Sequence, residues 1–249
     1  MINSGREWDW MDVKQKTIAI IPARWGSTRL PGKPLADING KTMIQWVYEA
    51  VKKSNVDKVV IATDHKDILK EVERFGGEAV MTSINNETGT ERVLEAYQKY
   101  KNEYRYVINI QGEEPIINEN DINNIIWQLN NEPYKIATLV GQLTKDQGID
   151  RNTVKAIIDN EDIIMFTRSP AVNFSVVVRR HIGIYGFSKA MSERIDKNVM
   201  VKTTNEIAEN LEQIRWSDNG IRFSYTFAAG LYKGIDTQKD LEKVRTYLN

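Results

Sequence analysis

Three cationic side chains lie close together in one short stretch of the sequence: Arg24, Arg29 and Lys33. They belong to the segment AIIPARWGSTRLPGKPL, residues 19–35, in which glycine, serine and proline separate them. Glycine lets a backbone approach a ligand closely, and successive N–H groups can then surround phosphate oxygens. A surface turn with solvated charges is the simpler interpretation of the same residues. The combination of cations with small residues favours a site for a highly charged anion.

Two well-known phosphate-binding patterns do not fit this segment. The pattern G-x-x-x-x-G-K-[ST] requires four residues between its glycines, but five separate Gly26 from Gly32, and Pro34 stands where a magnesium-binding hydroxyl would be needed. The dinucleotide pattern G-x-G-x-x-G also fails, because no glycine follows Gly26 two positions later. The segment therefore predicts an anion site of another kind.

The composition excludes several classes of protein. The chain has 249 residues with 34 Lys and Arg against 34 Asp and Glu, and this balance argues against a nucleic-acid or membrane-surface binder. Because there is no cysteine, disulfides and thiolate metal sites are excluded. A zinc site would need carboxylates, since His65 and His181 are the only histidines.

The termini and the hydropathy predict a soluble, cytoplasmic protein. Residues 1–16, MINSGREWDWMDVKQK, mix charges with apolar residues and do not resemble a signal peptide. No run of apolar residues is long enough to span a membrane. We expect residues 1–15 to form a loose extension and residues 16–249 to form one domain.

Apolar runs typical of buried strands alternate with segments of helical periodicity in the first part of the chain. The predicted strands are residues 17–23, 56–64, 78–82 and 105–112, and the predicted helices are 42–54, 65–77 and 118–131. Residues 85–100 are predicted to be a loop that runs into a helix. This alternation predicts an α/β fold with a doubly wound, mostly parallel sheet. Ligands of such sheets bind at the carboxyl ends of the strands, where the cationic loop, Asp64 and the QGEEP turn (111–115) fall.

The second part of the chain is richer in strands. The predicted strands are residues 136–143, 153–159, 163–167, 180–187 and 221–227, and the predicted helices are 204–216 and 237–248. In the first of these helices Ile207, Leu211 and Ile214 are spaced to share one face. We therefore expect a β-rich second half within the same domain.

The cationic loop resembles the signature of sugar nucleotidyltransferases, P-A-R-x-x-S-x-R-L-P-G-K-x-L. The matching residues are Pro22, Ala23, Arg24, Ser27, Arg29, Leu30, Pro31, Gly32, Lys33 and Leu35. This form is similar to that of the 3-deoxy-manno-octulosonate (Kdo) cytidylyltransferases, the CMP-Kdo synthetases of Gram-negative bacteria. Further segments that resemble this family follow in order, among them TGTER (88–92), INIQGEEP (108–115), FTRSP (166–170), HIGIYGF (181–187), LEQIR (211–215) and GIDTQKDLEKVR (234–245).

The resemblance covers residues 17–248 and implies a fold and a reaction. The implied fold is a Rossmann-like nucleotidyltransferase, and the implied reaction, a step of lipopolysaccharide biosynthesis, is CTP + Kdo → CMP-Kdo + pyrophosphate. The anomeric hydroxyl of the sugar would attack the α-phosphorus, so catalysis would consist mainly of positioning and neutralisation of charge. The resemblance also implies a homodimer, with the β-rich part around residues 136–200 serving sugar binding and dimerisation.

For the nucleotide, the resemblance implies roles for Arg24 and Lys33 on the triphosphate. Gly26, Ser27 and backbone N–H groups would close around it, and Pro22 and Ala23 belong to the same segment. Arg29 could contribute or could form a structural ion pair. Arg92 and Gln111 are the further nucleotide-side candidates. The segment that contains Arg92 also reads as a helix start, because Thr88 precedes Glu91 by three positions as in a capping box.

For a metal, the resemblance implies Mg²⁺, with Mn²⁺ as a possible substitute, at Glu113 and Asp236. Magnesium prefers oxygen ligands and usually takes one or two protein carboxylates together with phosphate oxygens. The family commonly has aspartate where this chain has Glu113, whose side chain is one methylene longer. Glu114 matches the family and is the alternative ligand, or only a structural partner. Arg24, Lys33, Glu113 and Asp236 are thus the predicted catalytic residues.

For the acid sugar, five residues fall in the family's sugar-contact segments: Arg168, His181, Tyr185, Glu212 and Gln213. A lone histidine such as His181 is more often a core residue, but its place in HIGIYG beside two arginines favours a site. Glu212 could equally be a charge on the surface of a helix.

The chain departs from the family pattern in two segments that border the sugar. SPAVNFSVVVRR (169–180) is short and apolar, and KTTNEIAENLEQ (202–213) replaces the usual start of a helix. Alternative substrates are therefore an 8-amino analogue of Kdo, another 2-keto acid sugar or a phosphonate. An impaired homologue that only binds its ligands is the alternative from a different class.

Overall fold

The computed structural model describes residues 15–26, 29–170, 176–198, 201–230, 232 and 234–248. The expected loose extension therefore lies outside the described residues except for Gln15. The same holds for Ser27 and for residues 171–175 of the first segment that departs from the family.

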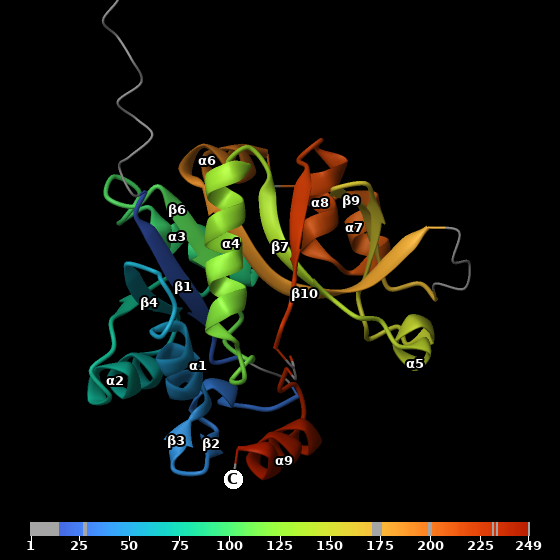
Figure 1. Ribbon diagram of the computed structural model, residues 1–249. Coiled ribbons are helices and arrows are strands. Elements are labelled where there is room, and N and C mark those ends of the chain that lie inside the picture. Colours follow the sequence, from blue (N-terminus) through green and yellow to red (C-terminus); the bar gives the residue numbers. More distant parts are fainter. Residues whose placement is uncertain are drawn as a thin grey trace, which may run out of the picture.

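Nine strands of the described chain form one continuous sheet in the order β5-β4-β1-β6-β10-β7-β11-β9-β8 (Figure 1). The strands are β1 (Thr17–Ala23), β4 (Lys58–Thr63), β5 (Ala79–Met81), β6 (Tyr106–Asn109), β7 (Ile136–Gly141), β8 (Lys155–Asp159), β9 (Asp162–Thr167), β10 (Val177–Ser188) and β11 (Phe223–Phe227). A short hairpin of β2 (Asp37–Ile38) and β3 (Lys41–Thr42) lies apart from this sheet.

The sheet has a parallel part and a mostly antiparallel part. β5, β4, β1 and β6 run parallel, and β7 runs parallel to β11. The long strand β10 runs antiparallel to β6, β7 and β8, and β9 is antiparallel to β8 and β11. The predicted α/β class and β-rich second half are confirmed. The parallel arrangement is concentrated in the first half, where the βα alternation is regular.

Helices cover both faces of the sheet. They are α1 (Met43–Val51), α2 (Lys66–Arg74), α3 (Gly89–Tyr97), α4 (Glu119–Asn131), α5 (Lys145–Ile149), α6 (Lys189–Asn198), α7 (Thr204–Glu209), α8 (Glu212–Asp218) and α9 (Gln238–Tyr247), with a 3₁₀ turn at Lys33–Leu35. One core contains apolar residues of α3, α6 and α8, and the other contains those of α1, α2 and α4. Among the described residues, no helix has the length and apolar character needed to cross a lipid bilayer.

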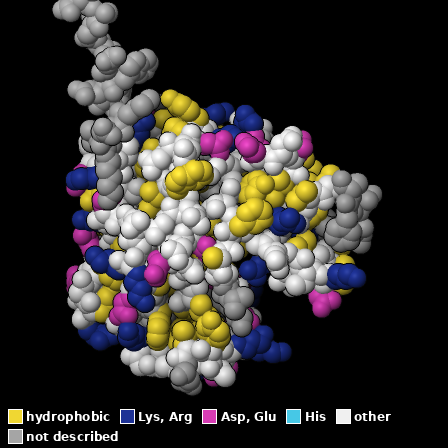
Figure 2. All heavy atoms as spheres, viewed as in Figure 1, with side chains coloured by type: hydrophobic (Ala, Val, Ile, Leu, Met, Phe, Trp, Pro, Cys, Tyr) yellow, Lys and Arg dark blue, Asp and Glu magenta, His cyan; other side chains and the backbone are white. Residues whose placement is uncertain are grey.

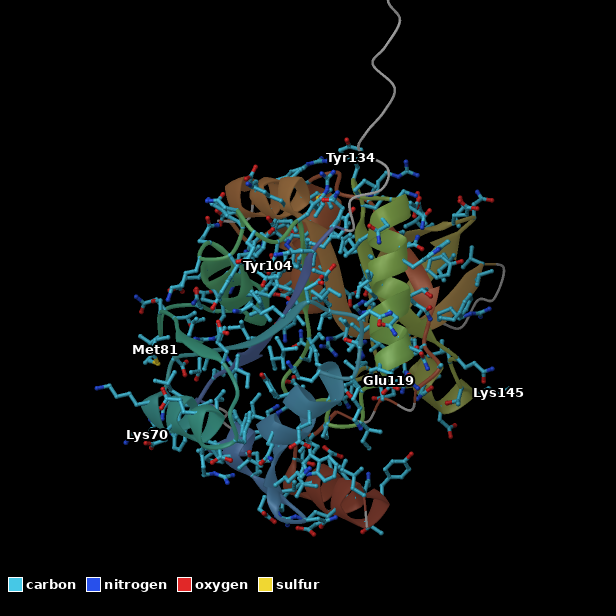
Figure 3. The ribbon with its side chains drawn as sticks, turned by 60° about the vertical axis from the view of Figure 1, so that its left-hand side comes forward. Lys70, Met81, Tyr104, Glu119, Tyr134 and Lys145 are labelled. Atoms are coloured by element: carbon cyan, nitrogen blue, oxygen red, sulfur yellow. The ribbon has the colours of Figure 1, made fainter. Side chains whose placement is uncertain are left out.

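Strand and helix ends place the predicted site at one edge of the sheet. β1 is almost completely buried and ends at Ala23, immediately before the cationic loop. α3 begins with the capping box predicted for Thr88 and Glu91, so its first turn is fixed at the same edge. The start of α4, marked by Glu119, lies toward this edge, while Tyr134 beyond its other end lies at the opposite edge (Figure 3).

The single helix predicted for residues 204–216 is wrong. Asn210, with φ 52° and ψ 52°, ends α7 in the left-handed conformation, and α8 starts afresh at Glu212. Asparagine tolerates this conformation, so the chain can turn there without glycine. Ile207 consequently points away from the core with 66% of its surface exposed, whereas Leu211 and Ile214 are buried. Helix α6 was not predicted either.

Candidate active site

The carboxyl edge of the parallel strands carries a cavity of about 240 Å³. Most predicted nucleotide-side and metal-side residues line it: Pro22, Ala23, Arg24, Arg29, Lys33, Arg92, Gln111, Glu113 and Asp236. Thr88 and Gly89, at the start of α3, also line it. Gly26 is not among the lining residues, and Ser27 lies outside the described residues. Sequence reasoning missed Asn86 and Glu87, which also line the cavity.

Cations and carboxylates meet at one side of this cavity. The Lys33 Nζ lies 3.3 Å from Asp236 Oδ1 and 3.9 Å from Glu113 Oε2. Arg29 Nη2 lies 3.1 Å from the same Asp236 oxygen, so Arg29 both forms an ion pair and lines the cavity. The Lys33 side chain is 13% exposed, and its ion pairs are therefore less screened than surface pairs. Two carboxylates thus share one partly buried ammonium group.

Backbone contacts hold Asp236 beside the QGEEP turn. The Ile235 N–H donates to the carbonyl oxygen of Glu113 over 3.0 Å. A Cβ atom on Gly234 would lie 3.0 Å from Glu114 Oε1, so a glycine allows the two segments to approach closely. Asp236 and Glu113, 123 positions apart in the sequence numbering (236 minus 113), are therefore fixed relative to each other by the backbone.

The donor set fits a hard divalent cation. Both candidate ligands are carboxylates, and oxygen is the ligand that Mg²⁺ prefers. Among the described residues, no group of three or more His, Cys, Asp or Glu is arranged to hold a metal ion. A Mg²⁺ ion that takes only one or two protein carboxylates would need its remaining ligands from phosphate oxygens and water.

Glu114 has a different environment from Glu113. It lines a second cavity and is not among the residues that line the first. Burial, and next the neighbouring charge of Glu113, raise the pKa of the Glu114 carboxyl to about 8. Its Oε2 atom is buried and has no hydrogen-bond partner among the described residues. This placement supports Glu113 over Glu114 as a ligand on the nucleotide side.

Arg92 lines the first cavity, but its guanidinium group is engaged by the protein. It donates to Asp64 over 2.9 Å, to the Thr82 hydroxyl over 2.6 Å and to the Ser83 carbonyl over 3.3 Å. Asp64 also accepts from the backbone N–H of Trp25 over 3.0 Å. The Asp64–Arg92 pair therefore ties the cationic loop to α3. In the sequence, the position of Asp64 at the carboxyl end of a predicted strand was the feature that pointed to this edge of the sheet.

The second cavity, of about 310 Å³, adjoins the first, because Gln111 and Glu113 line both. Four of the five residues predicted for the sugar line it: His181, Tyr185, Glu212 and Gln213. Arg168 does not, and its Nη1 donates instead to the carbonyls of Arg151 over 3.3 Å and Asn152 over 3.1 Å. Asn210, at the break between α7 and α8, also lines the cavity and was missed.

His181 is a buried, neutral residue in the wall of this cavity. Burial lowers its pKa to about 3, so the ring is uncharged near neutral pH. Its Nε2 lies 3.0 Å from the Thr138 hydroxyl, and its ring packs edge-on against Phe166 with centroids 4.8 Å apart. His181 therefore belongs to the core and also lines the cavity, and its contact with a sugar stays a prediction. It offers a hydrogen bond rather than a positive charge.

Tyr185 and Glu212 are titratable groups whose charged forms are disfavoured. Burial raises the pKa of the Tyr185 phenol well above its usual range. Burial also raises the pKa of the Glu212 carboxyl, against the opposing effect of a hydrogen bond from Thr90. Glu212 is therefore a buried carboxyl group, and the alternative of a charge on the surface of a helix does not apply. No Lys or Arg is among the described residues that line this second cavity.

Comparison with known proteins agrees with this geometry. A family model of cytidylyltransferases matches residues 18–223. The 3-deoxy-manno-octulosonate cytidylyltransferase of Fusobacterium nucleatum is 42% identical over 240 residues, covering 94% of this chain and 97% of that protein. The protein of the same name from Escherichia coli is 36% identical over 240 residues, covering 94% of this chain and 96% of its own.

Solved structures give the same result. A CMP:2-keto-3-deoxy-manno-octonic acid synthetase complexed with CTP matches with a TM-score of 0.88 and 35% identity, covering 94% of this chain and 98% of the other. A putative glucose-1-phosphate thymidylyltransferase of Bacillus anthracis, at TM-score 0.68 and 15% identity, shares the fold. The chain therefore belongs to the 3-deoxy-manno-octulosonate cytidylyltransferase family.

Proposed function

We propose that the protein transfers CMP from CTP to the anomeric hydroxyl of Kdo. In this reaction the anomeric oxygen forms a bond to the α-phosphorus, the bond from that phosphorus to the β-phosphate oxygen breaks, and pyrophosphate leaves with the electron pair. The hydroxyl proton is lost to the surroundings. The observation that carries the proposal is the pair of adjoining cavities, because both substrates must meet where Gln111 and Glu113 line both.

Residues of the first cavity suit the triphosphate. Arg24, Arg29 and Lys33 would bind its oxygens, and preorganised cations of this kind stabilise charge that develops on a leaving pyrophosphate. Gln111 and the start of α3 would face the rest of the nucleotide. When bound, Mg²⁺ or Mn²⁺ at Glu113 and Asp236 would neutralise phosphate charge.

Residues of the second cavity suit a polyhydroxylated sugar. Gln213, Tyr185 and His181 supply neutral hydrogen-bonding groups, and Glu212 supplies an acceptor. No Lys or Arg is among the described residues that line this cavity, so Lys33 and the metal on the nucleotide side are the groups we propose to balance the sugar carboxylate.

Selectivity for the base tests the nucleotide half of the proposal. We expect CTP to be used in clear preference to UTP, ATP and GTP in a pyrophosphate-release assay with Kdo. Cytosine and uracil differ by an amino group in place of a carbonyl, and buried polar sites reject such exchanges because a partner is left unpaired. The sugar panel should include 8-amino-Kdo, another 2-keto acid and a phosphonate, since residues 169–180 and 202–213 depart from the family pattern. Equal turnover with all four nucleotides would contradict the assignment.

We also propose that the enzyme is a homodimer through the outer strands of the sheet. Hydrophobic side chains gather there on the surface over β9 and β11 (Figure 2). The exposed apolar residues on β9, β10 and β11 are Ile164, Met165, Val177 and Phe227. Exposed apolar side chains that gather in one place favour an interface, and a second copy is the occupant that the family resemblance implies.

Sedimentation velocity tests the dimer. The parent should sediment as a dimer at micromolar concentration and Phe227→Glu as a monomer, because a charge in an apolar interface is costly to bury. Tyr134→Glu is the matched control, since Tyr134 is also exposed but lies at a different part of the surface (Figure 3). A monomeric parent protein would refute the proposal.

A further inference from the structure

Three polar side chains form a hydrogen-bonded chain beneath the second cavity. The Asn109 side-chain amide donates to the Thr90 hydroxyl over 3.0 Å, and that hydroxyl donates to Glu212 Oε1 over 2.7 Å. Thr90 and Asn109 are almost completely buried, at 2% and 0% exposure. The three residues come from α3, the end of β6 and the start of α8. These three hydrogen-bonded side chains therefore connect the proposed nucleotide side of the molecule with the proposed sugar side.

The donors and acceptors give this series of hydrogen bonds a direction, from Asn109 through Thr90 to Glu212. Because the Thr90 oxygen accepts a hydrogen from Asn109, its single proton is available for Glu212. One carboxylate oxygen of Glu212 is thereby fixed. The other, Oε2, is buried and has no hydrogen-bond partner among the described residues. A buried carboxylate oxygen without a partner is costly, and Glu212 lines the second cavity, where a sugar hydroxyl would supply a donor.

Thr90 occupies an informative place on α3. Its neighbours Thr88, Gly89 and Arg92 line the nucleotide cavity, but Thr90 is not among the lining residues of either cavity. Its hydroxyl is used for Glu212 instead. The first turn of α3 thus serves both substrates, one through the residues that face the nucleotide and the other through Thr90.

We propose that Thr90 is a positioning residue for the acid sugar, acting by orienting the Glu212 carboxylate toward a sugar hydroxyl. This inference rests on the proposed function, which makes Glu212 a sugar contact. Asn109 supports the same arrangement by fixing the direction of the Thr90 hydroxyl. Thr90 would then affect recognition of the sugar although it belongs to a segment of the nucleotide site.

Thr90→Val is the decisive variant, because valine keeps the shape of threonine and replaces only its hydroxyl by a methyl group. We expect the KM for Kdo to rise about tenfold, the loss expected for a hydrogen bond to a charged group, with the KM for CTP changed by less than about twofold. CTP affinity from isothermal titration should likewise stay near that of the parent. Thr90→Ser should restore the KM for Kdo, since serine keeps the hydroxyl.

A double-mutant cycle separates positioning from general structural damage. If Thr90 acts through Glu212, Thr90→Val should add little to the defect of Glu212→Gln. Fully additive effects, failure of Thr90→Ser to restore the KM, or equal losses for both substrates would overturn the inference. Failure of the proposed function is a different result, because the parent enzyme itself would then release no pyrophosphate with CTP and Kdo. Thermal unfolding of each variant identifies any that fails to fold.

Discussion

Asp236→Asn is expected to lose nearly all cytidylyl transfer, roughly a hundredfold to a thousandfold in kcat, as when other preorganised electrostatic groups are removed. The substitution keeps the size of the side chain but removes the charge that faces Lys33 and Arg29 and that would hold Mg²⁺. Pyrophosphate release at a series of Mg²⁺ concentrations measures the effect. The half-saturating Mg²⁺ concentration should rise together with the loss of kcat, because an amide oxygen is a weaker ligand than a carboxylate for a hard cation.

Asp240→Asn is the matched control for this variant. Asp240 lies four positions further along and accepts hydrogen bonds from Thr237 at the start of α9, so the same chemical change should affect stability rather than metal dependence. Chelation should abolish the activity of the parent, and Mg²⁺ or Mn²⁺ should restore it. Full activity in excess chelator would refute the metal proposal.

Substitutions at Glu113 decide between the two neighbouring glutamates. Glu113→Asp should keep substantial activity, with an altered preference between Mg²⁺ and Mn²⁺, because the carboxylate remains but is one methylene shorter. A Glu113→Ala variant as active as the parent at limiting Mg²⁺ would remove Glu113 from the ligand set. Glu114 would then take that role, despite its place in the second cavity.

Lys33→Ala should lower kcat/KM for CTP by roughly tenfold to a hundredfold, the range for a lost hydrogen bond to a charged group. The ammonium group lies 3.3 Å from Asp236 and 3.9 Å from Glu113, and the resemblance assigns it to the triphosphate. The fold should survive, because Lys33 lies in a 3₁₀ turn at the edge of the sheet and not in a core. Steady-state kinetics with varied CTP, together with thermal unfolding, checks both statements.

Lys16→Ala provides the comparison for Lys33. Lys16 pairs with Glu103 on the surface, where both side chains are more than half exposed, and such pairs contribute little to stability. Its removal should leave the kinetics with CTP unchanged. If Lys33→Ala behaved like Lys16→Ala, Lys33 would have no role in nucleotide binding.

Helices, strands and caps that depend on local residue patterns could be predicted from the sequence. The buried run of β1 and the capping box at Thr88 depend on local patterns, and both were found where the patterns placed them. The contact between Lys33 and Asp236 could not be predicted from a local pattern. These residues are far apart in the sequence, and only the resemblance to a family associated them, since periodicity says nothing about which loops meet.

Features that depend on the conformation of a single residue or on contacts with distant segments could not be predicted. The apolar spacing of Ile207, Leu211 and Ile214 fits one continuous helix equally well, and the left-handed conformation of Asn210 that breaks it leaves no trace in that spacing. Likewise, the direction of the Arg168 side chain depends on the carbonyl groups of a distant loop. The burial of His181 follows from the strands that surround it.

The position of β10 in the sheet has a consequence for synthesis of the chain. β6 is complete at Asn109, but its second neighbour is β10, which starts only at Val177, after β7, β8 and β9 have been made. A nascent chain that has reached α4 therefore carries an open strand edge, of the kind that pairs with other chains and promotes aggregation. The first half of the chain cannot complete its sheet until β10, in the second half, has emerged from the ribosome. Separately expressed halves should consequently depend on each other for solubility.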